Sequence, residues 1–351
     1  MKLKNKYVFG LLCQFYELEM LDEHIKSCVQ MIEGIENPEN VTFDFCFSTQ
    51  EHYEKVDWDY FRDKYPTHLK YNHTNIDKET LESDIFKRKI FNDSIRELQN
   101  IAIRTFNQIG VGYVTGNCKT SNSKFYNIAD ARRDLNYKYC KEVDLICWSE
   151  CDSLWSKQTL HLLEALHERV KDTTPKYIVN FSDRKLWDNS FAPVHPMFEK
   201  SIITDELTDE ASGKSYMSLE RMNEINNISI DEVVVDTFTE PRFDGSCVCF
   251  SSELIKSGVN IPHSLLLAGE DTSIGIIAKK LLGDNFVQYN FKNVLHVHNR
   301  RHPNKRTGIL NENNPNGFCD ERKGNWWKEL EDKSKFNLNN LFNQVEFKTL
   351  K

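Results

Sequence analysis

The spacing of apolar residues predicts alternating strands and helices at the start of the chain. Residues 7–13 form an apolar run, which is typical of a strand buried on both faces. Apolar side chains recur every three or four positions over residues 21–35, the period of an amphipathic helix. Over residues 41–47 they alternate with polar ones, the period of a strand. Because a helical crossover joins strands in parallel, this β–α–β opening predicts an α/β fold with a mostly parallel sheet flanked by helices.

The same periods predict further elements along the chain. Helices are expected over residues 84–109, 125–140, 157–170 and 273–282, with 217–226 as a further candidate. Strands are expected over residues 143–148, 177–181, 246–250, 286–289 and 294–298. The Thr, Gly, Asn and Ser content of residues 115–124 predicts a loop, and residues 50–80 are predicted to be irregular.

The length favours one large domain with additions. The chain has 351 residues, which corresponds to one large domain or two ordinary ones at roughly 100–200 residues per domain. Residues 183–240 have a charged stretch and no clear period, so we interpret them as an inserted irregular region. We expect the main domain over residues 1–310. Residues 311–351 are then a C-terminal extension that packs on the body.

Composition and charge exclude several classes of protein. A hydrophobic content of 39% with 22 Phe and 13 Tyr supplies a sizeable core, which excludes a disordered chain. The net charge of −8 excludes a globally basic nucleic-acid-binding protein, although not a local basic patch. No apolar run approaches ~18 residues, so no membrane span is expected. Ten scattered cysteines without a C-x-x-C pair predict reduced, mostly buried thiols and a cytoplasmic location, the alternative being a secreted disulfide framework.

Two short motifs carry the side chains of a metal site. Glu150 and Asp152 follow a predicted strand, and acids at this spacing beside a turn can both reach one hard cation. His296 and His298 share one face of a later strand, so one or both can complete a set suited to manganese. Each motif also has an ordinary interpretation. The acids fit a solvated turn, and the histidines fit one buried and one exposed ring.

Glu270 and Asp271 stand at the start of a predicted helix, directly after Gly269. Unpaired N–H groups and the helix dipole favour acids at this position, so capping alone explains them. The functional interpretation is a general base held on a loop.

Basic residues form two further candidates. Residues 299–306 hold four fixed positive charges and no acid, namely Arg300, Arg301, Lys305 and Arg306. Such a segment can bind a diphosphate, contact a nucleic-acid backbone or simply be solvated. Arg132 and Arg133, in the helix before Glu150, form a second candidate of the same kind.

The order of these motifs resembles the GT-A nucleotide-sugar glycosyltransferases, especially the family-two-like inverting group. The resembling segments are residues 131–136, 144–152, 243–253, 269–272 and 294–298. The likeness spans roughly residues 5–50 and 125–300. The chain departs from the pattern where the metal motif begins with Glu150 rather than Asp, and where the second strand ends without an acid.

The resemblance implies a Rossmann-like GT-A catalytic domain that moves a sugar from a nucleoside-diphosphate sugar, expected to be a UDP-sugar, to an acceptor hydroxyl with inversion. Asp152 then matches a direct ligand of Mn²⁺ or Mg²⁺, with Glu150 beside it, and His298 or His296 matches the late metal-binding histidine. Asp271 matches the catalytic base, with Glu270 next to it.

The resemblance also implies donor contacts. Tyr16 and Glu17 lie where the family holds the nucleotide base and ribose. The expected diphosphate contacts are Arg132, Arg133, Arg300, Arg301 and Lys305. Residues 183–240 would then flank the acceptor.

The sequence leaves the identity of the acceptor open. The composition is reminiscent of bacteriophage enzymes that glycosylate hydroxymethylcytosine in DNA, which implies DNA as a partner and the host cytoplasm as the location. A bacterial polysaccharide or a glycolipid is the alternative acceptor. Two other classes use the same residues, a metal-dependent hydrolase of nucleotides and a non-catalytic nucleotide-sugar binding module. The sequence makes no prediction of the oligomeric state.

Overall fold

A computed structural model describes residues 1–14, 21–48, 83, 100, 104, 107, 113–119, 128–185, 195–198, 217–238, 240–241, 245–265, 269–299 and 325–343. Its strands are β1 (Tyr7–Gln14), β2 (Val41–Ser48), β3 (Tyr113–Lys119), β4 (Leu145–Glu150), β5 (Ser153–Leu154), β6 (Tyr177–Lys185), β7 (Val235–Phe238), β8 (Cys247–Ser251) and β9 (Val287–His298). Its helices are α1 (Leu21–Ile32), α5 (Ile128–Tyr139), α6 (Thr159–Val170), α7 (Leu219–Ile225), α8 (Ser252–Lys256), α9 (Glu270–Leu282) and α10 (Asn325–Asn339).

The strands join into one nine-stranded sheet with the order β3-β2-β1-β4-β8-β6-β9-β5, and β7 pairs with β9. β1 pairs in parallel with both β2 and β4, and β2 pairs in parallel with β3. β8 runs antiparallel to β4 and β6, whereas the long β6–β9 ladder is parallel. The longest ladders are therefore parallel, and the predicted α/β class with a mostly parallel sheet is confirmed.

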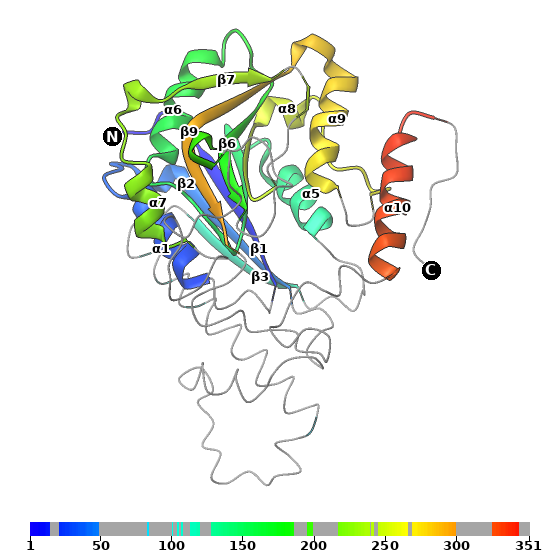
Figure 1. Ribbon diagram of the computed structural model, residues 1–351, viewed down its shortest axis with the longest axis horizontal. Helices are drawn as coiled ribbons and strands as arrows, with labels where there is room; N and C mark the ends of the chain where they lie inside the picture. The colour runs from blue at the N-terminus through cyan, green and yellow to red at the C-terminus, as the bar shows by residue number, and fades with distance from the viewer. Residues whose placement is uncertain are drawn as a thin grey trace.

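Helices cover both faces of the sheet, as Figure 1 shows, with α1 and α6 on one side and α5, α8 and α9 on the other. Each face has its own apolar cluster. The first is rich in aromatic rings, with Phe9 in edge contact with Trp155 at 5.1 Å. The second buries the inner faces of α5 and α9 around Trp148 and Phe250, whose ring centroids lie 4.5 Å apart. This three-layer packing fixes the ends of the central strands, where the candidate site lies.

Two predictions about the strands are wrong in detail. Residues 113–119 form β3 beside β2, although residues 115–124 were expected to be a loop. The hydrogen-bonding edge of β2 overrides the low strand preference of Gly116 and Asn117. The two strands predicted over residues 286–289 and 294–298 are one continuous strand, β9, which begins at Val287 and pairs with β6 across a register shift.

The other predicted helices and strands are confirmed where the structure describes them, whereas β5, β7, α8 and α10 were not predicted. α7 lies within the segment proposed as helical, and β7 adds part of the irregular region to the sheet edge. α10 lies beyond α9 (Figure 1), where Asn337 Nδ2 donates to the Ser264 carbonyl at 2.7 Å and Leu338 is buried in the second cluster. The predictions for residues 50–80 and 84–109 fall almost wholly outside the described residues.

Two further findings concern membranes and thiols. No helix in the described part of the chain is long and apolar enough to cross a membrane. The seven cysteines whose side chains the structure describes are free thiols, and all of them except Cys46 are buried.

A buried histidine makes stability depend on pH. Burial lowers the pKa of His24 to about 4, and its Nδ1–H donates to the Ser153 carbonyl at 2.6 Å. The unfolded chain binds this proton near pH 6.5, so acidification below that value favours unfolding. Between pH 7 and pH 5 we expect the wild type to lose about 2 kcal/mol more stability than His24→Asn, which keeps a donor but does not titrate. Urea unfolding at both pH values measures this, and equal losses in the two proteins would contradict it.

Candidate metal and catalytic site

Glu150, Asp152 and His298 converge at the carboxyl end of β4. One ligand atom from each lies within 4.8 Å of the others. His298 Nε2 is 3.0 Å from Glu150 Oε2 and 3.0 Å from Asp152 Oδ1. Asp152 and His298 are buried, and the Glu150 side chain is 21% exposed. Two carboxylates and one imidazole form a donor set that suits manganese or a similar divalent ion, so these residues fit a metal centre.

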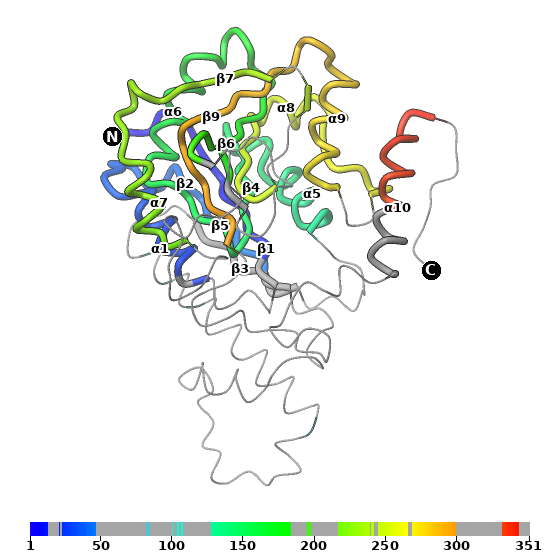
Figure 2. Tube along the Cα trace, in the orientation of Figure 1, coloured from blue at the N-terminus to red at the C-terminus, as the bar shows by residue number. Residues whose placement is uncertain are grey.

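The sheet brings these distant residues together through a short ribbon. β5 runs antiparallel to the end of β9, with Ser153 opposite His298 (Figure 2). The Asn299 N–H donates to the Asp152 carbonyl at 2.7 Å and extends this pairing by one step. Because only a short turn separates β4 from β5, the ribbon places Glu150, at the end of β4, and Asp152, in this turn, against the last residue of β9.

His296 occupies a different place from His298. Its ring stacks on Phe181 with a centroid distance of 3.9 Å, and Trp155 meets it edge-on at 5.2 Å. Its Nε2 lies 3.3 Å from Thr159 Oγ1. Burial lowers the pKa of His296 to about 3, so the ring is neutral at physiological pH. The structure therefore brings His298 to the acids and leaves His296 in the aromatic core.

Arg132 links the metal-ligand cluster to the start of α9. Its guanidinium donates to Glu150 Oε1 at 3.0 Å, to Glu270 Oε1 at 2.8 Å and to the Gly245 carbonyl at 2.5 Å. It also lies over the Trp148 ring, 5.0 Å from the centroid. The residue is 4% exposed. Its described hydrogen bonds are to other protein groups, and its contact with the diphosphate stays a prediction.

Glu270 and Asp271 begin α9, three residues earlier than the predicted helix start. Burial raises the pKa of Glu270, the Asp271 carboxylate raises it further, and Arg132 opposes both effects. Asp271 Oδ1 accepts from the Thr272 N–H at 2.6 Å and lies 3.3 Å from Thr272 Oγ1. Its other oxygen faces Gly245, where an added Cβ would lie 2.6 Å away. Gly245 therefore allows this carboxylate to approach the backbone between β7 and β8.

The remaining predicted contacts are placed elsewhere or are not described. Arg133 turns away from the cluster, because its Nε donates to the Ile261 carbonyl at 2.7 Å and its Nη1 pairs with Asp130 at 2.7 Å. The other predicted donor contacts lie outside the described residues, namely Tyr16, Glu17, Arg300, Arg301 and Lys305.

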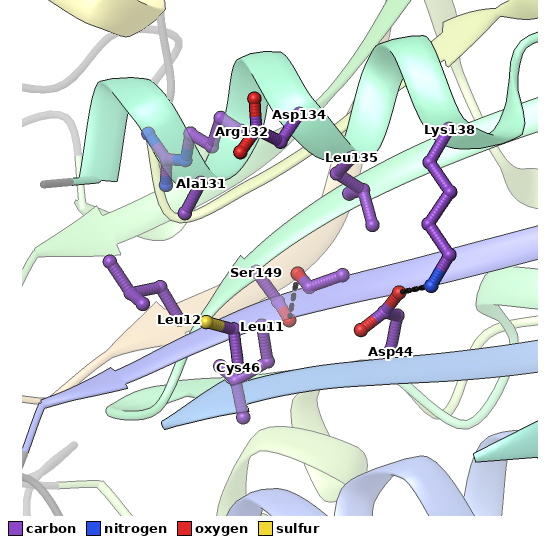
Figure 3. Close-up of a pocket in the computed structure, with 11 residues that line it drawn as sticks. Leu11, Leu12, Asp44, Cys46, Ala131, Arg132, Asp134, Leu135, Lys138 and Ser149 are labelled. Atoms are coloured by element: carbon purple, nitrogen blue, oxygen red, sulfur yellow. Dashed lines mark hydrogen bonds and ion pairs between the residues drawn. The ribbon is translucent and has the colours of Figure 1, made fainter. Parts of the chain in front are cut away.

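A cavity lies beside the site, between α5 and the strands β1 and β2 (Figure 3). Arg132 and Ser149 line one part of it, and Lys138 donates to Asp44 Oδ2 at 2.7 Å in another. Gly10 lets α5 pack closely here, since an added Cβ would lie 2.0 Å from Leu135 Cδ2.

Sequence reasoning missed Asp44 and Asp183. Asp44 also accepts from the Tyr139 hydroxyl at 2.8 Å. Asp183, on β6, accepts from Ser246 Oγ at 2.8 Å, one residue from the Gly245 carbonyl that Arg132 contacts. Asp183 comes just after the apolar stretch of β6, as Glu150 comes at the end of the apolar stretch of β4, and this was the signal that could have identified it.

Comparisons with known proteins give only distant likenesses. No family model matches the chain, and no curated protein matches it. The mannosyltransferase PcManGT from Pyrobaculum calidifontis, in complex with GDP-Man and Mn²⁺, is 10% identical with a TM-score of 0.47, and covers 98% of this chain and 66% of its own. S. aureus TarS 1-349 in complex with UDP-GlcNAc is 9% identical with a TM-score of 0.45, over 97% of this chain and 68% of its own.

GalNAc-T7 with UDP, GalNAc and Mn²⁺ is 9% identical with a TM-score of 0.45, over 84% of this chain and 44% of its own. This chain thus spans less than two thirds of the length of PcManGT and of GalNAc-T7. All three TM-scores lie below 0.5, so these likenesses assign neither a family nor an activity to this chain.

Proposed function

We propose that this protein is a divalent-metal-dependent glycosyltransferase of the GT-A type, which uses a nucleoside-diphosphate sugar as donor. The convergence of Glu150, Asp152 and His298 supports the proposal, because His298 is distant in the sequence from the two acids and yet one ligand atom from each residue lies within 4.8 Å of the others. Arg132 connects this cluster to Glu270, the first residue of α9, which is followed by Asp271. The order of the sequence motifs agrees with the same assignment.

The described residues have distinct tasks in such a reaction. Glu150, Asp152 and His298 would hold Mn²⁺ or Mg²⁺, which supplies positive charge to the diphosphate as it leaves. Asp271 takes the proton of the acceptor hydroxyl while the hydroxyl oxygen bonds to the anomeric carbon. The bond between this carbon and the phosphate oxygen breaks at the same time, and the nucleoside diphosphate departs with the bonding electrons. A single displacement inverts the anomeric centre.

The cavity beside α5 supports a place for the nucleoside. Leu12 and Cys46, near the carboxyl ends of β1 and β2, line it together with Arg132. Ligands of open α/β sheets bind beyond the carboxyl ends of the strands. We therefore assign the nucleoside end of the donor to this side of the cluster and the sugar to the side of Asp271.

Release of nucleoside diphosphate from a panel of nucleotide sugars tests the proposal directly. With Mn²⁺ present we expect release from at least one donor, expected to be a UDP-sugar, and loss of that release when EDTA removes the metal. A product analysis in which the sugar stays joined to an added acceptor distinguishes transfer from hydrolysis. Hydrolysis of simple phosphoesters without sugar transfer would favour the metal-dependent hydrolase, and donor binding without turnover would favour the binding module.

For the acceptor, we propose hydroxymethylcytosine in DNA as the first candidate to test. The support is the basic segment directly after His298, which the sequence places beside the metal ligands. The same assay with hydroxymethylated and unmodified DNA checks this, and binding to DNA should weaken steeply with salt. Transfer to a polysaccharide or glycolipid, with none to modified DNA, would replace this acceptor and leave the glycosyltransferase assignment intact.

A further inference from the structure

The buried Arg132 makes contacts with both halves of the candidate site. One nitrogen, Nη2, lies 3.0 Å from Glu150 Oε1 and 2.5 Å from the Gly245 carbonyl. The other, Nη1, lies 2.8 Å from Glu270 Oε1. The planar guanidinium presents its donors in a fixed fork, so one side chain sets the relative placement of three segments.

The two oxygens of Glu150 have different partners. Oε1 accepts from Arg132, whereas Oε2 lies 3.0 Å from His298 Nε2. The bond to Arg132 therefore turns Oε2 toward the place where the ligand atoms converge. Outer groups that hold a metal-binding carboxylate in this way contribute substantially to metal affinity.

The same guanidinium holds the beginning of α9. Glu270 is bound directly, and Gly245, whose carbonyl Arg132 also contacts, packs against the Asp271 carboxylate. A change at Arg132 is thus transmitted both to a metal ligand and to the proposed base.

We propose that Arg132 is a positioning residue, which orients Glu150 for the divalent cation and keeps the Asp271 end of α9 in register with the metal site. The inference rests on the proposed function. The competing explanation is purely structural, in which Arg132 only balances the charge of Glu270, whose side chain is 12% exposed. A buried charge left without its partner is costly, so Arg132→Met alone would lower stability under either explanation.

A set of variants separates the two roles. Arg132→Lys keeps the positive charge but removes the planar guanidinium and its fixed set of donors. Arg132→Met with Glu270→Gln removes the buried pair together, and Glu270→Gln alone keeps the bond to Glu150. Arg133→Lys is the matched control, because Arg133 is equally buried on the same helix but contacts Asp130 and backbone carbonyls away from the cluster.

The measurements are Mn²⁺ affinity, followed by electron paramagnetic resonance of the free ion, and the thermal unfolding midpoint without metal. We expect Mn²⁺ to bind roughly 10- to 100-fold more weakly in Arg132→Lys and in the double variant. Glu270→Gln and Arg133→Lys should keep a Mn²⁺ affinity near that of the wild type, whatever their thermal unfolding midpoints. The double variant should recover most of the stability that Arg132→Met loses.

Wild-type Mn²⁺ affinity in the double variant would overturn the inference. The role left to Arg132 would then be to balance the charge of Glu270. A 10-fold or greater loss of affinity in Arg133→Lys would also overturn it, since the effect would then be general to the helix. A wild-type protein that binds no Mn²⁺ would overturn the metal dependence of the proposed function and this inference with it. A wild-type protein that binds Mn²⁺ without sugar transfer would contradict the proposed function alone.

Discussion

Replacement of Asp271 by Asn is expected to lower the rate of sugar transfer by about 10²- to 10⁴-fold, the usual contribution of a general base. The substitution is nearly isosteric. Asn can keep the oxygen that accepts from the Thr272 N–H, while the oxygen that faces Gly245 becomes an amide nitrogen unable to take a proton. The loss should therefore appear in kcat, with the affinities for Mn²⁺ and for the donor close to those of the wild type.

Asp284→Asn is the matched control for this variant, because Asp284 is exposed in the turn after α9 and makes a 3.6 Å ion pair with Lys279. It should transfer sugar at the wild-type rate. Initial rates of nucleoside diphosphate release and calorimetric titration with the donor measure the two effects separately. Near-wild-type turnover in Asp271→Asn would remove this residue from the role of base.

Replacement of Asp152 by Asn is expected to weaken Mn²⁺ binding by more than about 100-fold, because a direct ligand loses its charge. Asp152 is 3% exposed and lies 3.0 Å from His298 Nε2, so few other ligands can reach the same point. Sugar transfer should fall with the metal affinity. Saturating Mn²⁺ should stabilise the wild type by about 2.7 kcal/mol at 100 times Kd and leave the variant almost unchanged.

His296→Phe is the control for the metal site. The ring stacks on Phe181 in the core, so Phe keeps the packing and removes only the contact with Thr159. Its Mn²⁺ affinity should stay near the wild-type value, even if its stability falls. If His296→Phe lost the metal and Asp152→Asn kept it, the ligand set proposed for this site would be wrong.

The periodicity of the chain predicted most of the architecture around the site. The apolar run over residues 7–13 and the alternation over 41–47 became the parallel pair β1 and β2. The prediction was wrong over residues 115–119, where β3 forms because β2 offers an open edge. A polar, glycine-containing stretch has no local signal for such pairing, which depends on a neighbour distant in the sequence.

The residue types of the site and their order could be predicted from the sequence, since Glu150 and Asp152 stand at and just after the end of an apolar strand and Asp271 stands at a helix start. Only the tertiary structure chose between the two histidines. The strand period places both histidines on one face of β9. His296 lies within the aromatic core, in contact with Trp155 and with Thr159 at the start of α6, whereas His298 lies at the strand end beside β5. Likewise, only the packing of α5 on β1 and β4 brought Arg132 between Glu150 and Glu270. Local patterns carry the period of an element, while the partner of a buried charge depends on which elements pack against it.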